Sequence, residues 1–129
     1  MKFMLLMSCT KAQFETLGAW KPEEFKAHVE FMKRYNEELK RSGELVLAEG
    51  LDIPHNAKLV RATQPSAPAV TDGPFAETKE FLAGFWIVQC ASRERAVELA
   101  AKASTAPGPG GAPMGIPIEL RQVMQAPEV

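Results

Sequence analysis

The stretch of residues 70–80 constrains the fold more than any other, because it bends the backbone just before a long apolar run. Gly73 can adopt backbone angles that other residues avoid. Pro74 fixes its own φ, donates no N–H and keeps Gly73 out of the helical region. Asp72 can accept hydrogen bonds from backbone N–H groups further on, and Phe75 is expected to anchor the bend in the core. The stretch therefore predicts a rigid turn clamped by an aspartate.

The charged residues after the bend have two interpretations. Glu77, Lys79 and Glu80 precede the apolar run. They are either solvated residues that protect the start of a strand from wrong pairing, or part of a functional site built on the bend. Spacing alone does not separate the two.

Length, charge and composition exclude several classes of protein. The 129 residues suit one domain, 1–129, with one core. A net charge of −1 gives no basic face for nucleic acid. No apolar run is long enough to span a bilayer, so we expect no membrane partner. The N-terminal run lacks a cleavage site, and Cys9 and Cys90 make no disulfide framework. We therefore expect a cytoplasmic protein.

Apolar periodicity, prolines and glycines predict an order of β-α-β, a β-hairpin and β-α-β. Residues 8–21 are expected to form a loop with room for one turn of helix, pinned by Phe14, Leu17 and Trp20 as part of a pocket wall or a partner contact. Residues 107–113 are expected to be a mobile loop. The predicted elements are a strand at 3–7, a helix that opens at 21–24 and ends at 42–43, a strand at 44–51, a hairpin of 58–62 and 69–71, a strand at 81–90, a helix at 93–103 and a strand at 116–122.

This order predicts an α+β, ferredoxin-like split βαβ fold with an inserted hairpin. Both helices would cover one face of the sheet. The strands at 3–7 and 81–90 are apolar on both faces, so the other face would be a large exposed apolar patch. Two copies that meet through these faces would bury it, and we predict a symmetric homodimer.

Two local details refine the prediction. Helical spacing predicts one apolar stripe on the first helix, formed by Phe25, Val29, Met32, Asn36 and Leu39. His28 and Tyr35 lie on a flank of that stripe, which we expect to be neither fully buried nor fully exposed. Gly84, inside the strand at 81–90, predicts a bulge or a close backbone approach.

The motif Asp72-Gly73-Pro74-Phe75 is followed by Ala76-Glu77-Thr78-Lys79-Glu80, and the chain opens with Met1-Lys2-Phe3-Met4-Leu5-Leu6-Met7. These runs resemble the DGPF family of the YCII-related superfamily, and the resemblance covers nearly the whole chain. It extends to Asn36-Glu37-Glu38-Leu39 with Gly43, to Glu49-Gly50-Leu51 and to Gly84-Phe85-Trp86. The resemblance implies a dimeric α+β barrel, and a cleft where an aspartate works with a histidine as an acid–base pair.

The candidate catalytic residues are Asp72 and His28. A carboxylate can orient an imidazole, and an imidazole can move a proton near neutral pH. The helix position where relatives carry histidine holds Met32 here, and His28 lies one turn earlier. We expect the ligand-binding residues to be Tyr35, Glu49, Gly73, Phe75, Lys79 and Trp86.

Other arrangements of these residues stay open. Glu49 and Asp72 could converge and raise one pKa, or Lys79 and Arg61 could neutralise them in a structural ion-pair cluster. His55, in a turn, is expected to have a surface role.

Two functions remain. The chain is either a small acid–base enzyme that acts on a small metabolite through Asp72, or a non-catalytic dimeric module that binds a small ligand or a protein. No metal-ligand spacing, phosphate loop or nucleophile motif occurs in the sequence, so we expect neither a metal nor a cofactor. Whether the protein is an enzyme is left open.

Overall fold

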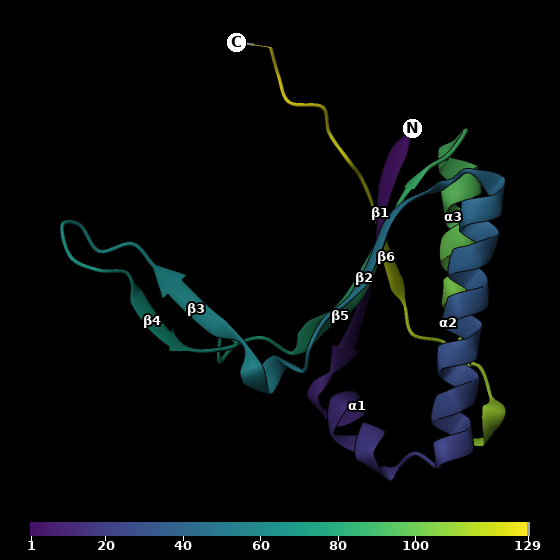
Figure 1. Cartoon of the computed structure of the whole chain (residues 1–129), viewed down its shortest axis with the longest axis horizontal. Coiled ribbons are helices and arrows are strands. Elements are labelled where there is room, and N and C mark those ends of the chain that lie inside the picture. Colours follow the sequence, from purple (N-terminus) through teal and green to yellow (C-terminus); the bar gives the residue numbers. More distant parts are fainter. Residues whose placement is uncertain (129) are drawn as a thin grey trace.

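A computed structural model describes residues 1–128 as a four-stranded antiparallel sheet with helices on one face. The sheet order is β2 (Leu45–Gly50), β5 (Glu80–Gln89), β1 (Lys2–Thr10) and β6 (Ile118–Gln122). The helices α2 (Pro22–Ser42) and α3 (Arg93–Ala103) lie side by side against it (Figure 1). This is the predicted ferredoxin-like split βαβ order.

The core lies between the sheet and these two helices. The central strands supply Phe3 and Leu5 from β1 and Val88 from β5, each 0% exposed. Pro22 opens α2 and Gly43 ends it at φ 78°, both as predicted. Ser92 caps α3 by accepting a hydrogen bond from the backbone N–H of Arg95, at 3.1 Å.

The buried stripe of α2 differs from the predicted one. Tyr35, expected on a flank, is 2% exposed, whereas Phe25, expected in the core, is 54% exposed. The Tyr35 ring stacks on Phe31 and meets Trp86 edge-on, with centroids 6.2 and 5.3 Å away. Its hydroxyl donates to the carbonyl of Leu99, at 2.8 Å. Because α3 accepts this hydrogen bond, the tyrosine can be buried without an unsatisfied polar group.

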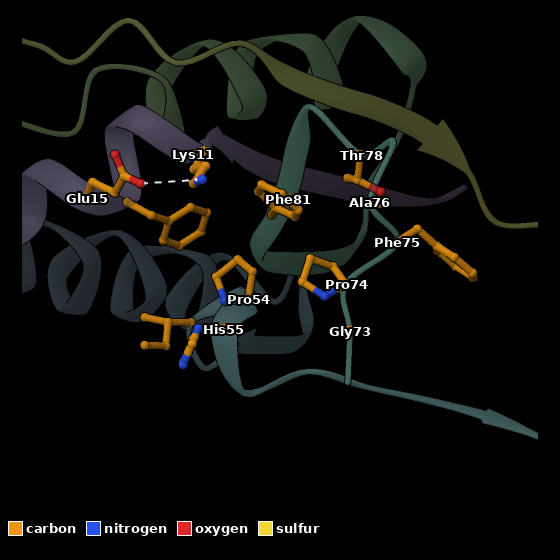
Figure 2. Close-up of a pocket in the computed structure, with 12 residues that line it drawn as sticks. Lys11, Glu15, Pro54, His55, Gly73, Pro74, Phe75, Ala76, Thr78 and Phe81 are labelled. Atoms are coloured by element: carbon orange, nitrogen blue, oxygen red, sulfur yellow. Dashed lines mark ion pairs between the residues drawn. The ribbon is translucent and has the colours of Figure 1, made fainter. Parts of the chain in front are cut away.

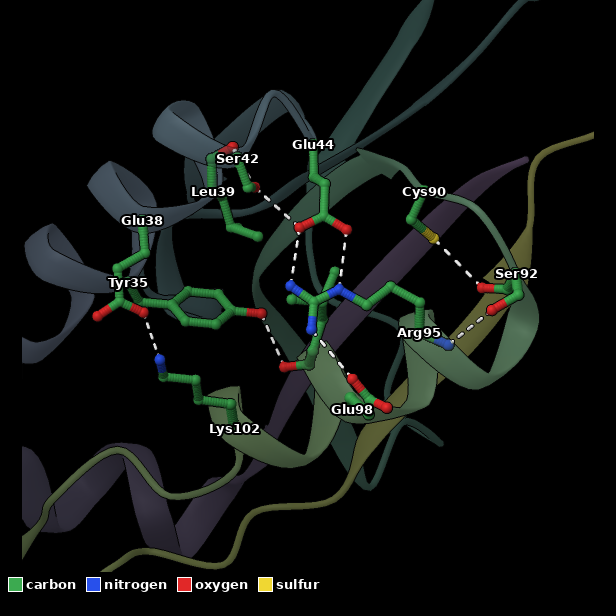
Figure 3. Close-up of polar contacts among 11 residues, drawn as sticks. Tyr35, Glu38, Leu39, Ser42, Glu44, Cys90, Ser92, Arg95, Glu98 and Lys102 are labelled. Atoms are coloured by element: carbon green, nitrogen blue, oxygen red, sulfur yellow. Dashed lines mark hydrogen bonds and ion pairs between the residues drawn. The ribbon is translucent and has the colours of Figure 1, made fainter.

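An ion pair ties α3 to the start of β2 (Figure 3). Arg95 donates from Nε to Oε2 of Glu44 and from Nη2 to Oε1, each at 2.9 Å. Ser42 donates to the same carboxylate at 2.8 Å. The Arg95 guanidinium therefore lowers the pKa of Glu44 and, through the same contacts, raises its own.

Two segments expected to be loops are more ordered than the sequence predicts. Residues 8–21 hold the end of β1, the helix α1 (Lys11–Thr16) and the 3₁₀ turn η1 (Leu17–Ala19). The side chains of Thr10 and Gln13 cap the start of α1 reciprocally. The segment 107–113, expected to be mobile, contains the 3₁₀ turn η3 (Pro109–Gly111) and is pinned to α2.

The predicted hairpin is confirmed as a separate two-stranded sheet of β3 (Lys58–Arg61) and β4 (Ala69–Asp72). We call it the arm, because it projects away from the rest of the protein (Figure 1). The 3₁₀ turn η2 (Pro54–Asn56) leads into it. Val60 and Val70 pair across the arm and are 67% and 59% exposed.

The bend after the arm is tight, but it is not clamped as predicted. The N–H of Gly73 donates to the carbonyl of Ala57 at 2.8 Å, and a Cβ at Gly73 would lie 3.2 Å from Cγ of Leu59. Asp72 does not clamp the bend, since it pairs with Lys58 across the arm at 2.5 Å. Phe75, predicted to be an anchor, is 64% exposed. The clamp comes from close packing of backbone instead.

The predicted close approach at Gly84 is confirmed. A Cβ there would lie 2.9 Å from the backbone oxygen of Glu49, so only glycine lets β5 approach β2 this closely. The register of β5 against β1 shifts beside it, between Met7 and Ser8.

The face of the sheet opposite α2 and α3 is not covered by a helix. Apolar residues of three strands share the face that α2 and α3 leave bare: Met4, Leu6, Leu47, Phe85 and Ile87.

Cys9 and Cys90 are free thiols, and burial raises the pKa of Cys9, with a smaller effect of Glu80. Over residues 1–128, no helix has the length and apolarity that crossing a membrane requires.

Candidate functional site

A cavity of about 280 Å³ lies between α2 and the sheet. Trp86 forms its floor and is 6% exposed; its indole N–H donates to Oδ1 of Asn36 at 2.7 Å. The lining is mostly apolar and comes from α2, β1, β2 and β5: Met7, His28, Met32, Asn36, Ala48, Glu49, Gly50, Ala83, Gly84, Phe85 and Trp86. A small apolar cavity with a few fixed polar groups is typical of ligand sites.

His28 is the titratable side chain that the helix presents to this cavity. Its Nδ1 lies 3.0 Å from the carbonyl oxygen of Pro107. A carbonyl oxygen only accepts, so Nδ1 carries the hydrogen in this contact. The lone pair of the neutral ring is then on Nε2, which is the nitrogen left for a ligand. Trp20 packs edge-on against the ring, with centroids 5.6 Å apart.

The loop that holds His28 is itself fixed. The N–H of Gly108 donates to the carbonyl of Ala112 at 2.8 Å, and Pro107 forms a bridge with Pro113. The N–H of Gly110 donates to the carboxylate of Glu24 in the first turn of α2. This hydrogen bond is the main reason that the pKa of Glu24 is lowered. The imidazole is therefore held in one orientation by a rigid loop.

The structure separates the predicted site residues into groups. His28, Glu49 and Trp86 line the helix–sheet cavity. Gly73 and Phe75 line a different cavity beside α1. Because Glu49 pairs with Phe85 in the sheet, its side chain lies on the uncovered face, and its backbone faces the cavity.

The fold of the chain does not bring Asp72 to His28. Its side chain is 87% exposed on the arm and is paired with Lys58. Lys58 takes the neutralising role that we considered for Lys79 and Arg61, and Glu49 does not converge with Asp72. Lys79 is exposed.

Tyr35 is a core residue rather than a lining residue of the helix–sheet cavity. Burial raises the pKa of its hydroxyl, mainly by desolvation, so it stays protonated at neutral pH. It supports the site indirectly, because its ring packs against Trp86, the floor of the cavity.

Sequence reasoning missed Pro107 and Asn36 as parts of the site. The carbonyl of Pro107 lies 79 residues from His28 in the chain, and no local pattern reports such a contact. Asn36 did carry a signal, since an amide within an apolar helical stripe needs a buried partner. That partner is the indole of Trp86.

The chemistry available in the cavity is proton exchange and hydrogen bonding at a single imidazole against an apolar wall. Within residues 1–128, His, Cys, Asp and Glu side chains form no group of three or more that could hold a metal ion.

Comparisons with known proteins agree with this architecture. The sequence profile of a family described as "YCII-related domain" matches residues 1–110, which include α2, the arm and Pro107. The chain is also similar to "Uncharacterized protein R00369" of Rhizobium meliloti (strain 1021). The two sequences are 33% identical over 89 residues, which cover 69% of this chain and 71% of that protein.

Proposed function

This chain belongs to the family of YCII-related domains, and we propose that it binds a small, mostly apolar metabolite in the helix–sheet cavity, with His28 as the acid–base group. The observation that carries the proposal is the contact of His28 Nδ1 with the carbonyl of Pro107. It fixes the tautomer and leaves Nε2 as a base at a cavity with an apolar wall.

The chemistry of the cavity narrows the ligand. Trp86, Met32 and Met7 offer flat or flexible apolar contacts, which suit a single ring. A neutral imidazole with a free Nε2 accepts a hydrogen bond or a proton. The preferred ligand therefore carries one acidic proton, as a phenol or an imide does. If the protein is an enzyme, His28 is its general base, and the reaction is a proton transfer on the bound metabolite.

We also propose that two copies form a symmetric dimer through the uncovered face of the sheet. The support is the band of apolar residues that runs across three strands there. Glu119 and Arg121 lie on the same face in β6, with their side chains 3.8 Å apart. An apolar band with a charged border is typical of a protein interface. A dimer of this kind would give the closed α+β barrel.

We also propose that the chain belongs to the DGPF branch of this family. The support is the sequence of residues 72–75 and the charged residues that follow them. In the wider YCII-related group an aspartate is expected to work with a histidine, and Asp72 is the candidate for that aspartate here. Since Asp72 lies on the arm in one protomer, an acid–base pair with His28 would require a second protomer to bring it.

The test uses ligand pairs that differ in one proton. Small phenols and imides, each beside its O- or N-methylated counterpart, are titrated into the labelled protein while the ring nitrogens of the histidines and the indole of Trp86 are followed by NMR. We expect the acidic member of each pair to shift His28 Nε2 and Trp86. His28→Gln should weaken its binding about two- to twelvefold, since a typical hydrogen bond contributes about 0.5–1.5 kcal/mol.

The second histidine of the chain provides the control. His55 lies outside this cavity, and His55→Gln should leave binding unchanged. Equal shifts from both members of each ligand pair, or unchanged binding in His28→Gln, would contradict the role of His28. A free protein in which Nε2 carries the hydrogen would contradict the tautomer on which the role depends.

A further inference from the structure

A second cavity, of about 520 Å³, lies between α1 and the loop that returns from the arm (Figure 2). Its walls are rings. Phe14 of α1 and Phe81 of β5 meet edge-on with centroids 6.4 Å apart. Figure 2 shows Pro54 and Pro74 around the same hollow, with Phe75 turned away from it. The volume falls within the usual range for small-molecule sites, and the flat walls suit a flat ring.

Each wall is fixed independently of a ligand. The carboxylate of Asp52 accepts from the N–H of Ile53 at 2.8 Å and from Nδ2 of Asn56 at 2.9 Å, which holds the η2 wall. The loop wall is held by the hydrogen bond from Gly73 to Ala57. The α1 wall is held by its reciprocal cap. The cavity is therefore preorganised, which lowers the cost of binding.

The rim carries one cationic and one anionic side chain, with a histidine beside them. Lys11 and Glu15 come from α1 and His55 from η2. Lys11 and Glu15 lie 3.9 Å apart with side chains 82% and 65% exposed, so their ion pair is weak. Because this ion pair is exposed and weak, Lys11 can turn to another anion at little cost.

We propose that this second cavity binds small aromatic carboxylates: the ring packs between the phenylalanine and proline walls, and the carboxylate pairs with Lys11. The cavity is separate from the one that holds His28, and the two share no lining residue. Binding in this second cavity therefore does not depend on the function proposed for His28.

The experiment compares acids with their uncharged isosteres. Benzoate, phenylacetate and indole-3-acetate, and the amide of each, are titrated at low salt while backbone amide resonances are followed by NMR. We expect shifts centred on residues 11–15, 53–56 and 73–81. Each acid should bind about two- to fivefold more tightly than its amide, the range that an exposed ion pair supports. The preference should fall as salt is raised.

Two rim variants should act in opposite directions. Lys11→Met should remove the preference for the acid, and Glu15→Gln should increase it, because it removes a repelling charge and frees Lys11. Equal affinity for acids and amides in the unmodified protein, or the same preference in both variants, would overturn the proposal.

A wall variant tests the ring contact. Phe14→Ala should weaken acids and amides alike by about tenfold or more, because it removes one of the two aromatic rings against which the ligand packs. Phe25→Ala removes an aromatic ring that is exposed on α2 outside the cavity, and should leave binding unchanged. The unperturbed amide spectrum of the sheet reports whether Phe14→Ala still folds. If it does not, Phe14→Leu provides the same test with a smaller change. Unchanged affinity in a folded Phe14 variant would also overturn the proposal.

Discussion

Replacing Glu44 by glutamine should destabilise the fold, because one carboxylate holds α3 to the start of β2. Its side chain is 14% exposed and accepts both bonds from Arg95 at 2.9 Å (Figure 3). Glutamine keeps the shape but removes the charge and one acceptor. Hydrogen bonds to charged groups contribute roughly 1.5–3 kcal/mol to stability, and removing one partner of a fully buried ion pair costs more than that. Arg95 is 42% exposed and can regain water, so we expect a loss of about 1.5–3 kcal/mol.

That loss converts into a measurable shift of the melting temperature. Unfolding entropies near 2.1 cal/mol/K per residue give about 0.27 kcal/mol/K for a chain of 129 residues. The melting temperature should then fall by about 6–11 °C at pH 7. Thermal unfolding followed by circular dichroism, at one protein concentration, measures it. Glu98→Gln is the matched control: Glu98 also accepts from Arg95, at 3.0 Å, but it is 67% exposed. Its removal should change stability by about 0.5 kcal/mol or less.

The pH dependence gives an independent check of the same contact. Because the pKa of Glu44 is lowered in the folded protein, its contribution is fully present above the unfolded value near 4.5. It is lost as the pH falls through the lower, folded value. The difference between the unmodified protein and Glu44→Gln should therefore be constant from pH 7 to about 5 and shrink below that. A difference that stays constant down to pH 3, or a loss under 0.5 kcal/mol at pH 7, would refute the reasoning.

Other substitutions follow from the same geometry. Tyr35→Phe should lower the free energy of unfolding in urea by about 1 kcal/mol, since it deletes one buried hydrogen bond, and should not change ligand binding. Loss of binding with unchanged stability would show that Tyr35 belongs to the site. Gly84→Ala should cost about 1–3 kcal/mol and speed amide exchange in β2, because the new Cβ meets backbone at 2.9 Å; normal exchange would contradict this. Leu6→Glu should disrupt the dimer that we propose through the uncovered face and give a monomer in sedimentation; a dimer that persists in this variant would contradict that interface. Asp72→Asn should change stability by about 0.5 kcal/mol or less, as its side chain is 87% exposed; a larger loss would show that the ion pair on the arm is structural.

Much of the fold could be predicted from the sequence because local rules and the hydrophobic pattern agree. Pro22 and Gly43 mark the ends of α2, and both rules depend only on the residues nearby. The strands at 3–7 and 81–90 are apolar enough to identify the centre of the sheet. The exception is α2, where the buried stripe is not the one that helical spacing predicts. Spacing placed Phe25 on the stripe and Tyr35 on its flank. It does not report that the ring of Tyr35 packs against Phe31 and Trp86, or that its hydroxyl reaches the carbonyl of Leu99.

The site was less predictable, because its decisive contacts join distant segments. His28 was a candidate because it lies one turn before the helix position where relatives carry histidine. Its orientation, however, depends on Pro107, in a segment that we expected to be mobile. Asp72 was placed in a clamp by a local rule, but the register of the arm puts it opposite Lys58. A local rule describes what a side chain can accept, and pairing across strands determines what it meets.

The bend at residues 72–75 organises the chain through its backbone rather than through its charges. Gly73 fits against Ala57 and Leu59, where a larger residue would press on both, and its N–H closes the base of the arm. Pro74 then forms one wall of the cavity beside α1. The same few residues therefore set the direction of the arm and the shape of a binding cavity. A substitution at Gly73 should disturb both together, whereas a change at Asp72 should alter only the exposed ion pair on the arm.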